Sequence, residues 1–207
     1  MAYIFAIHVP IAGLSLCAVL FRWPLILEPI HIAFLELIID PACSLIFEAE
    51  AEEADIMQRP PRPATEHLFN RRMIVTSLLQ GFGVLVILLA IFGVALQQGR
   101  GEADARALTF TSLVIANIAL IVTNRSWSRS TLAILKTPNA AMSWVVGGAS
   151  VVLALVLYVP FLRDLFHLST LHLNDIALCI GAGAVSLAWF ETLKVIHALA
   201  PSTDTNS

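Results

Sequence analysis

Six apolar stretches, each close to the length of a bilayer-spanning helix, dominate this sequence of 207 residues. A helix needs about 20 apolar residues to cross a hydrocarbon core of about 30 Å. Backbone N–H and C=O groups within that core must be paired inside the segment, which favours helices. The predicted fold class is therefore all-α, a polytopic membrane protein built as a six-transmembrane-helix bundle. Its expected spans are 3–21, 25–47, 74–96, 108–122, 141–159 and 176–199.

The composition agrees with a membrane protein. Hydrophobic residues make up 58% of the chain and charged residues 13%, with a mean hydropathy of +0.83, whereas soluble proteins are roughly half apolar and a quarter charged. The lipid bilayer is thus the expected partner. The net charge of −3 includes no basic run, so no nucleic-acid partner is expected. Three cysteines, each in an apolar stretch, do not predict a disulfide framework.

Lys and Arg divide unevenly between the two ends of the expected bundle. An even number of spans places both termini on one side, and by the positive-inside rule the side richer in Lys and Arg is cytoplasmic. Both termini are then expected in the cytoplasm, with 1–199 as one membrane domain and 200–207 as a cytoplasmic tail. A bacterial source would make the inner membrane the expected location. The richer side holds Arg59, Arg62, Arg71, Arg72, Arg125, Arg129, Lys136 and Lys194, and the other side Arg22, Arg100, Arg106 and Arg163.

Glu36 and Asp40 lie four residues apart in the second span, so a helix places both on one face. A carboxylate in hydrocarbon is costly unless it is protonated, paired or bound to a cation. Pro41 lacks an N–H, so the carbonyl of Leu37 loses its helical partner and the helix must kink or unwind. Freed carbonyls beside carboxylates suit a hard cation such as calcium, and broken helices bind ions in transporters. Alternatively, both carboxylates pair with donors on other helices and only hold the bundle together.

Two further polar residues are candidates for the same site. In the first span His8 precedes Pro10, which predicts a second broken helix and frees the carbonyl of Ala6. His8 can act as a cation ligand, a proton acceptor or a countercharge to a carboxylate, or as a donor at the membrane interface. Asn117 lies deep in the fourth span, where its amide completes a coordination shell or bonds a neighbouring helix. Gln80, followed by Gly81, is more typical of close helix packing than of a site.

Motifs of catalysis are missing from the sequence. There is no glycine-rich phosphate loop, HExxH zinc motif, paired CxxC or GxSxG elbow. We therefore expect no catalytic residue and no bound cofactor in this chain.

Several stretches together resemble a known family. They are "LELIIDPACS", the loop "ADIMQRPPRP" that follows it, "AIHVPIAG", "WPLILEPIHIAFLEL" and "NRSWSRSTLAILKTPN". The loop motif, an acidic stretch ending in D-x-M-x-R-P-P-R, is the most specific of them. The chain from its first residue to about Leu199 is similar to the C-terminal half of P-type cation-transporting ATPases, helices five to ten.

The resemblance implies a set of cation ligands. Asp40 falls on the family's central acidic ligand of helix six, and Glu36 falls where related calcium pumps have a polar ligand one turn earlier. Asn117 matches a helix-eight position that is acidic in some calcium pumps, and His8 matches a polar ligand of helix five. Ile11 stands where those pumps have an acidic ligand, so the resemblance leaves the transported ion undefined.

The metal preference implied by the resemblance is a hard cation, calcium or another. Soft-metal pumps carry a Cys-Pro pair in helix six, whereas here Asp40 precedes Pro41 and Cys43 follows it. Thiolates are the ligands expected for copper or zinc, so transport of those metals is disfavoured.

The sequence contains none of the family's ATP-hydrolysing elements, neither the phosphorylated Asp of D-K-T-G-T nor the T-G-E, T-G-D and G-D-G-x-N-D motifs. We expect no ATP hydrolysis from this chain alone, and ATP and Mg²⁺ only in a complete pump. The expected function is the ion-translocating C-terminal membrane domain of such a pump, present as a fragment, a split-gene product or a separate subunit whose partner is the missing catalytic half. The alternative is a non-catalytic membrane regulator or assembly partner of an intact pump.

Overall fold

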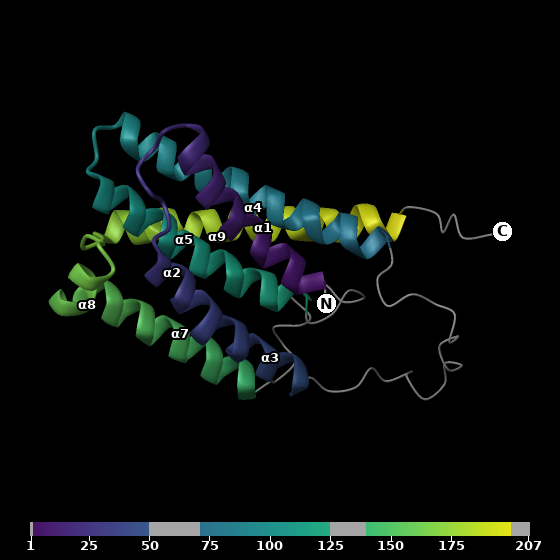
Figure 1. Ribbon diagram of the computed structural model, residues 1–207. Coiled ribbons are helices and arrows are strands. Elements are labelled where there is room, and N and C mark those ends of the chain that lie inside the picture. The colour runs from purple at the N-terminus through teal and green to yellow at the C-terminus, as the bar shows by residue number, and fades with distance from the viewer. Residues whose placement is uncertain (1, 50–70, 125–139, 200–207) are drawn as a thin grey trace.

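The computed structural model describes residues 2–49, 71–124 and 140–199, and within these ranges every regular element is a helix (Figure 1). The acidic loop with its "RPPRP" strap, the stretch from Arg125 to Asn139 and the C-terminal tail lie outside the described residues. The elements are α1 (Ala2–Leu20), α2 (Pro29–Phe34), the π-helix η1 (Leu35–Ile39), α3 (Asp40–Glu48), α4 (Arg71–Gln97), α5 (Glu102–Asn124), α7 (Ala140–Tyr158), α8 (Pro160–Leu165) and α9 (Leu173–Leu199).

Four helices in the described part of the chain, α4, α5, α7 and α9, are long and apolar enough to cross a membrane, and α1 is a shorter apolar helix. The expected second span consists of α2, η1 and α3 in direct succession. The all-α, polytopic membrane architecture predicted from the apolar stretches is confirmed. α5 begins six residues before the predicted span, because Glu102 and Asp104 in its first turn favour the positive end of the helix dipole.

The two prolines predicted to break helices behave differently. At Pro41 the helix changes type, with the π-helical turn η1 ending one residue before Asp40. At Pro10 the expected break is not present, since α1 stays α-helical from Ala2 to Leu20. A proline inside a membrane helix removes one hydrogen bond, and packing by a neighbouring helix allows the rest to continue. Here the neighbour is α4, where the position of a Cβ on Gly81 would lie 2.6 Å from the carbonyl oxygen of Ala6.

Helix α5 forms the centre of the bundle. It contacts α1, α4, α7 and α9, and 83% of its apolar window is buried, against 22% for α7 and 28% for α9. Around it, α1 and α4 run in the same direction, held close by Gly81 against Val9 and by Gly13 against Leu85. Small residues at such crossings let helix backbones approach in a membrane, where packing replaces the hydrophobic effect as the force between helices.

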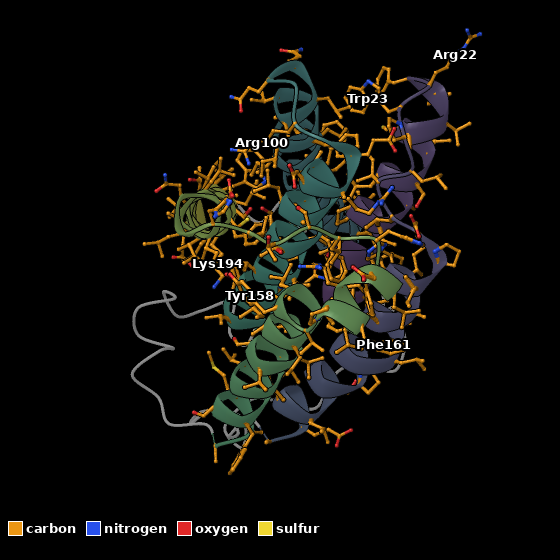
Figure 2. The ribbon with its side chains drawn as sticks, turned by 90° about the vertical axis from the view of Figure 1, so that its left-hand side faces the viewer. Arg22, Trp23, Arg100, Tyr158, Phe161 and Lys194 are labelled. Atoms are coloured by element: carbon orange, nitrogen blue, oxygen red, sulfur yellow. The ribbon has the colours of Figure 1, made fainter. Side chains whose placement is uncertain are left out.

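Helices α1 and α4 begin, and helices α5 and α9 end, at the same end of the bundle (Figure 1). The connections from α1 to α2, from α4 to α5 and from α7 through α8 to α9 gather at the opposite end, which Figure 2 shows face on, with Arg22, Trp23 and Arg100 labelled. There the hydroxyl of Tyr158 donates to the carbonyl of Leu171 at 3.0 Å and ties α7 to the segment before α9. This connecting end is therefore well supported by side-chain contacts.

Candidate cation site

The second span widens next to its acidic residues. Glu36 lies within η1, a single π-helical turn between the α-helical segments α2 and α3. Pro41 explains this geometry, because in an α-helix it would have to donate to Leu37 and has no N–H to do so. Single π-helical turns of this kind occur frequently at functional sites.

His8 of α1 contacts Glu36 of η1. Nε2 of His8 lies 3.3 Å from Oε1 of Glu36, and Nδ1 of His8 is 2.8 Å from the carbonyl oxygen of Ile4. The carbonyl can only accept, so Nδ1 carries a proton, and Nε2 faces the carboxylate. The structure thus places His8 beside a carboxylate, and its countercharge role, one of the alternatives that the sequence left open, stays a prediction. Both side chains are nearly half exposed, 45% for His8 and 44% for Glu36.

Asn117 of α5 is buried, with 1% of its surface exposed, and among the described residues neither its amide nitrogen nor its oxygen has a hydrogen-bond partner. The face of α5 that meets α9 is marked by Leu108, whose carbonyl accepts from Cys179, and by Ile115, which contacts Gly183. Asn117 is nine residues beyond Leu108, so at 100° per residue it points away from α9. Its buried, unpartnered amide is costly on its own and is suited to a ligand.

Asp40 begins α3, four residues after Glu36. Its side chain lies outside the described part of the structure, so its predicted role as a ligand stays a prediction. Among the described residues no group of three or more His, Cys, Asp or Glu side chains is arranged to hold a metal ion. The structure thus brings His8 and Glu36 together, while the amide of Asn117 bonds to neither of them.

A charge cluster at the connecting end, in which Arg106 is buried and His167 is exposed, was not predicted from the sequence. The guanidinium of Arg106 in α5 lies 3.3 Å from Glu28, which in turn contacts His167 at 2.6 Å. In the sequence, Arg106 was assigned only to the Lys and Arg residues outside the expected spans, with no partner. One local signal was present, since Glu28 directly before Pro29 is typical of the start of a helix. No local signal predicted the contact between Glu28 and His167, which are 139 positions apart in the chain.

Comparison with known proteins gives a consistent result. The family model described as "Cation transporting ATPase, C-terminus" matches residues 24–196. Among similar proteins, "Calcium-transporting ATPase" of Bacillus subtilis (strain 168) is 29% identical over 88% of this chain. "Calcium-transporting ATPase 1" of Schizosaccharomyces pombe is 23% identical over 92% of it, and human "Calcium-transporting ATPase type 2C member 1" is 24% identical over 93%. The chain spans 21% of the length of each of these three relatives.

Proposed function

The chain belongs to the cation-transporting ATPase C-terminus family, and from that premise we propose that it is the ion-translocating membrane domain of a P-type pump. In this role the kinked second span binds the transported cation, with Glu36 and Asp40 supplying charge and His8 and Asn117 completing the site. The observation that carries the proposal is the His8–Glu36 pair beside a π-helical turn in a membrane helix. Ionisable groups in such a place are costly and are typical of ion pathways.

The exposure of this pair supports a partner for the chain. A carboxylate and an imidazole, each nearly half exposed, cannot face lipid without a large cost. Leu37, the residue after Glu36, is also 76% exposed, so both residues lack a covering helix in the part of the chain that the structure describes. We propose that membrane helices of the rest of the pump cover it. The length of the relatives, about five times the part matched here, provides enough chain for such helices.

We propose a hard cation as the transported ion. Carboxylate and amide oxygens are ligands that calcium prefers, and the relatives are named as calcium-transporting. Ile11, a buried residue of α1, provides no oxygen ligand where the family's calcium pumps have an acidic one. The number of charges at the site is maintained only if Glu36 replaces that carboxylate, which the binding experiment below tests.

We also propose that both termini face the cytoplasm. The eight Lys and Arg residues assigned to that side support it by the positive-inside rule. The start of α1 and the end of α9, which are nearest the two termini, lie at the same end of the bundle (Figure 1). ATP hydrolysis, if this chain is coupled to it, must come from the rest of the pump, because the catalytic motifs are not in this sequence.

The test is equilibrium binding of radioactive calcium, with manganese as competitor, to the chain in lipid nanodiscs. Asp40→Asn and Glu36→Gln are each expected to abolish saturable binding. Asp164→Asn is the matched control, since Asp164 is an acidic residue of α8 that is 73% exposed and lies far along the chain from the site. Equal binding by wild type and Asp40→Asn would contradict the proposal and favour the non-catalytic regulator.

A further inference from the structure

The charge cluster at the connecting end joins three segments of the chain. Arg106 of α5 donates from Nε to the carbonyl of Leu25 at 3.1 Å and from Nη1 to the carbonyl of His167 at 2.9 Å. The same Nη1 lies 3.3 Å from Oε1 of Glu28. Oε2 of Glu28 accepts from Nδ1 of His167 at 2.6 Å. We refer to Arg106, Glu28 and His167 as the clasp.

The clasp holds the residue from which the second span starts. Glu28 precedes α2 directly, and its backbone N–H donates to Nδ1 of His31 at 2.9 Å. From Pro29 to Glu36 the chain is helical without a loop, because η1 follows α2 directly. Eight helical residues span about 12 Å. A displacement or rotation of Glu28 is therefore transmitted along a stiff element to Glu36.

Stability alone is a weak reason for such a cluster. Arg106 is only 7% exposed and its partner Glu28 is also largely buried, and a buried ion pair is often no more stabilising than apolar residues of the same size. What an Arg fork adds is direction, because its donors lie in one plane at fixed angles. The fork here holds Arg106 on the carbonyls of Leu25 and His167, and so places its charge 3.3 Å from Glu28, next to α5, the helix that also carries Asn117.

Aromatic packing beneath the clasp does not provide the same direction. The ring of His31 lies 4.8 Å from that of Phe110 and 5.6 Å from that of Phe166, between centroids, and Phe34 packs against the same two rings. These contacts hold α2 against α5 and the end of α8. Ring pairs prefer edge-to-face arrangements but are broad in their geometry, so they tolerate a sliding of α2 more readily than the hydrogen bond from Arg106 to the carbonyl of Leu25 does.

We propose that Arg106 is a positioning residue of the cation site, which acts through Glu28 to set the position of Glu36 and Asp40 relative to Asn117. This inference rests on the proposed function for its effect on binding. The clasp is remote from the ligands, so it contacts no cation. Its action resembles that of outer partners of metal ligands, whose loss typically weakens metal affinity about 10- to 100-fold.

The matched control is a second Arg–carboxylate pair at the same end of the bundle. Nη1 of Arg100 lies 2.6 Å from Oδ1 of Asp175 and ties the α4–α5 connection to the start of α9. Figure 2 labels Arg100 at this end. Neither residue belongs to the second span. Arg100→Gln and Arg106→Gln thus each remove an arginine from an ion pair, but only Arg106→Gln releases Glu28.

The first measurement is the dissociation constant for calcium of the full chain in nanodiscs, together with thermal unfolding. Arg106→Gln is expected to raise the dissociation constant about tenfold, whereas Arg100→Gln is expected to change it less than about twofold. Arg106→Lys keeps the charge but loses the fork, so its dissociation constant should fall between those of wild type and Arg106→Gln. It also serves if Arg106→Gln does not fold. Equal dissociation constants for the Arg100 and Arg106 variants would overturn the proposal.

A second measurement does not depend on cation binding. Spin labels at Leu37→Cys and Val86→Cys, both exposed positions, report the distance between η1 and α4 in a chain whose three native cysteines are replaced. Arg106→Gln should shift or broaden this distance distribution, and Arg100→Gln should not. If the wild-type chain binds no cation, the proposed function fails, and the distances alone decide on the clasp. An unchanged distribution in Arg106→Gln would overturn it.

Discussion

Two ion pairs in this molecule have the same separation and opposite surroundings. His8 and Glu36 approach to 3.3 Å, as do Arg106 and Glu28. The first pair is nearly half exposed, whereas the side chains of the second are 9% and 20% exposed and are supported by two backbone carbonyls and a further imidazole. Distance alone therefore does not describe an ion pair in a membrane bundle.

The surroundings indicate what each pair can do. A pair whose arginine is also hydrogen-bonded to two backbone carbonyls defines a geometry, and removal of one member leaves a charge without compensation. The nearly half-exposed pair is held by fewer contacts, since among the described residues it is supported by one backbone carbonyl, that of Ile4. The Arg106–Glu28 pair is thus part of the scaffold, and the His8–Glu36 pair is available to a ligand or to another helix.

The largest expected effect on stability comes from the buried pair. Glu28→Gln should lower the free energy of unfolding by about 2–3 kcal/mol, because Arg106 then stays buried opposite a neutral amide. Unfolding in mixed micelles, followed by circular dichroism, measures the change. The double variant Glu28→Gln/Arg106→Gln should lose less than the sum of the two single variants. Strict additivity would show that the two side chains do not act as a pair.

The contact between α1 and α4 gives the next effect. A methyl group on Gly81 would meet the carbonyl oxygen of Ala6 at 2.6 Å and Cβ of Val9 at 2.7 Å, so Gly81→Ala must push the helices apart. We expect a loss of about 1–3 kcal/mol. Gly147→Ala in α7 is the control, since nothing lies within 4 Å of the new methyl group, and it should be neutral or slightly stabilising. Similar losses in both variants would argue against close packing as the cause.

Much of the fold follows from local properties of the sequence. Apolar length identified the spans, and the missing N–H of Pro41 identified the place where the second span changes its helix type. Pro10 was treated in the same way, yet α1 continues through it. The difference depends on a neighbour, since α4 lies against the Ala6 carbonyl. A proline rule based on one helix cannot include that neighbour.

The candidate site was predictable in its residue types and not in its arrangement. Glu36 and Asn117 attract attention because polar groups are costly in apolar helices. The choice of Glu36 as the partner of His8 depends on the wide turn of η1 and on how α1 lies against it. The role of Arg106 could not be predicted, because its contact with His167 joins positions 61 apart and sequence periodicity does not indicate contacts over such a separation.

Asn117 is buried, as Arg106 is, but among the described residues its amide has no hydrogen-bond partner, which is typical of a ligand site. Since neither atom of its amide is hydrogen-bonded to any residue that the structure describes, Asn117→Leu should stabilise the chain without cation by up to about 1 kcal/mol. Thermal unfolding without and with calcium checks this, because the cation should stabilise wild type and not the variant. Asn124→Leu is the comparison, as its amide donates to the carbonyl of Leu120. If Asn117→Leu is instead destabilising without cation, its amide has a partner and is part of the scaffold.

The smallest effect on stability is expected for a substitution of Glu36, the residue whose loss should most affect calcium binding. Glu36→Gln should change the free energy of unfolding by less than about 0.5 kcal/mol, because removal of a costly carboxylate from a half-exposed membrane position offsets the loss of the ion pair with His8. The same substitution should abolish calcium binding. Glu28→Gln, measured in parallel, should reverse the order, with a large loss of stability and only weakened binding. If Glu36→Gln destabilises the chain as much as Glu28→Gln, the two pairs do not differ in kind, and the surroundings of Glu36 must be as closed as those of Glu28.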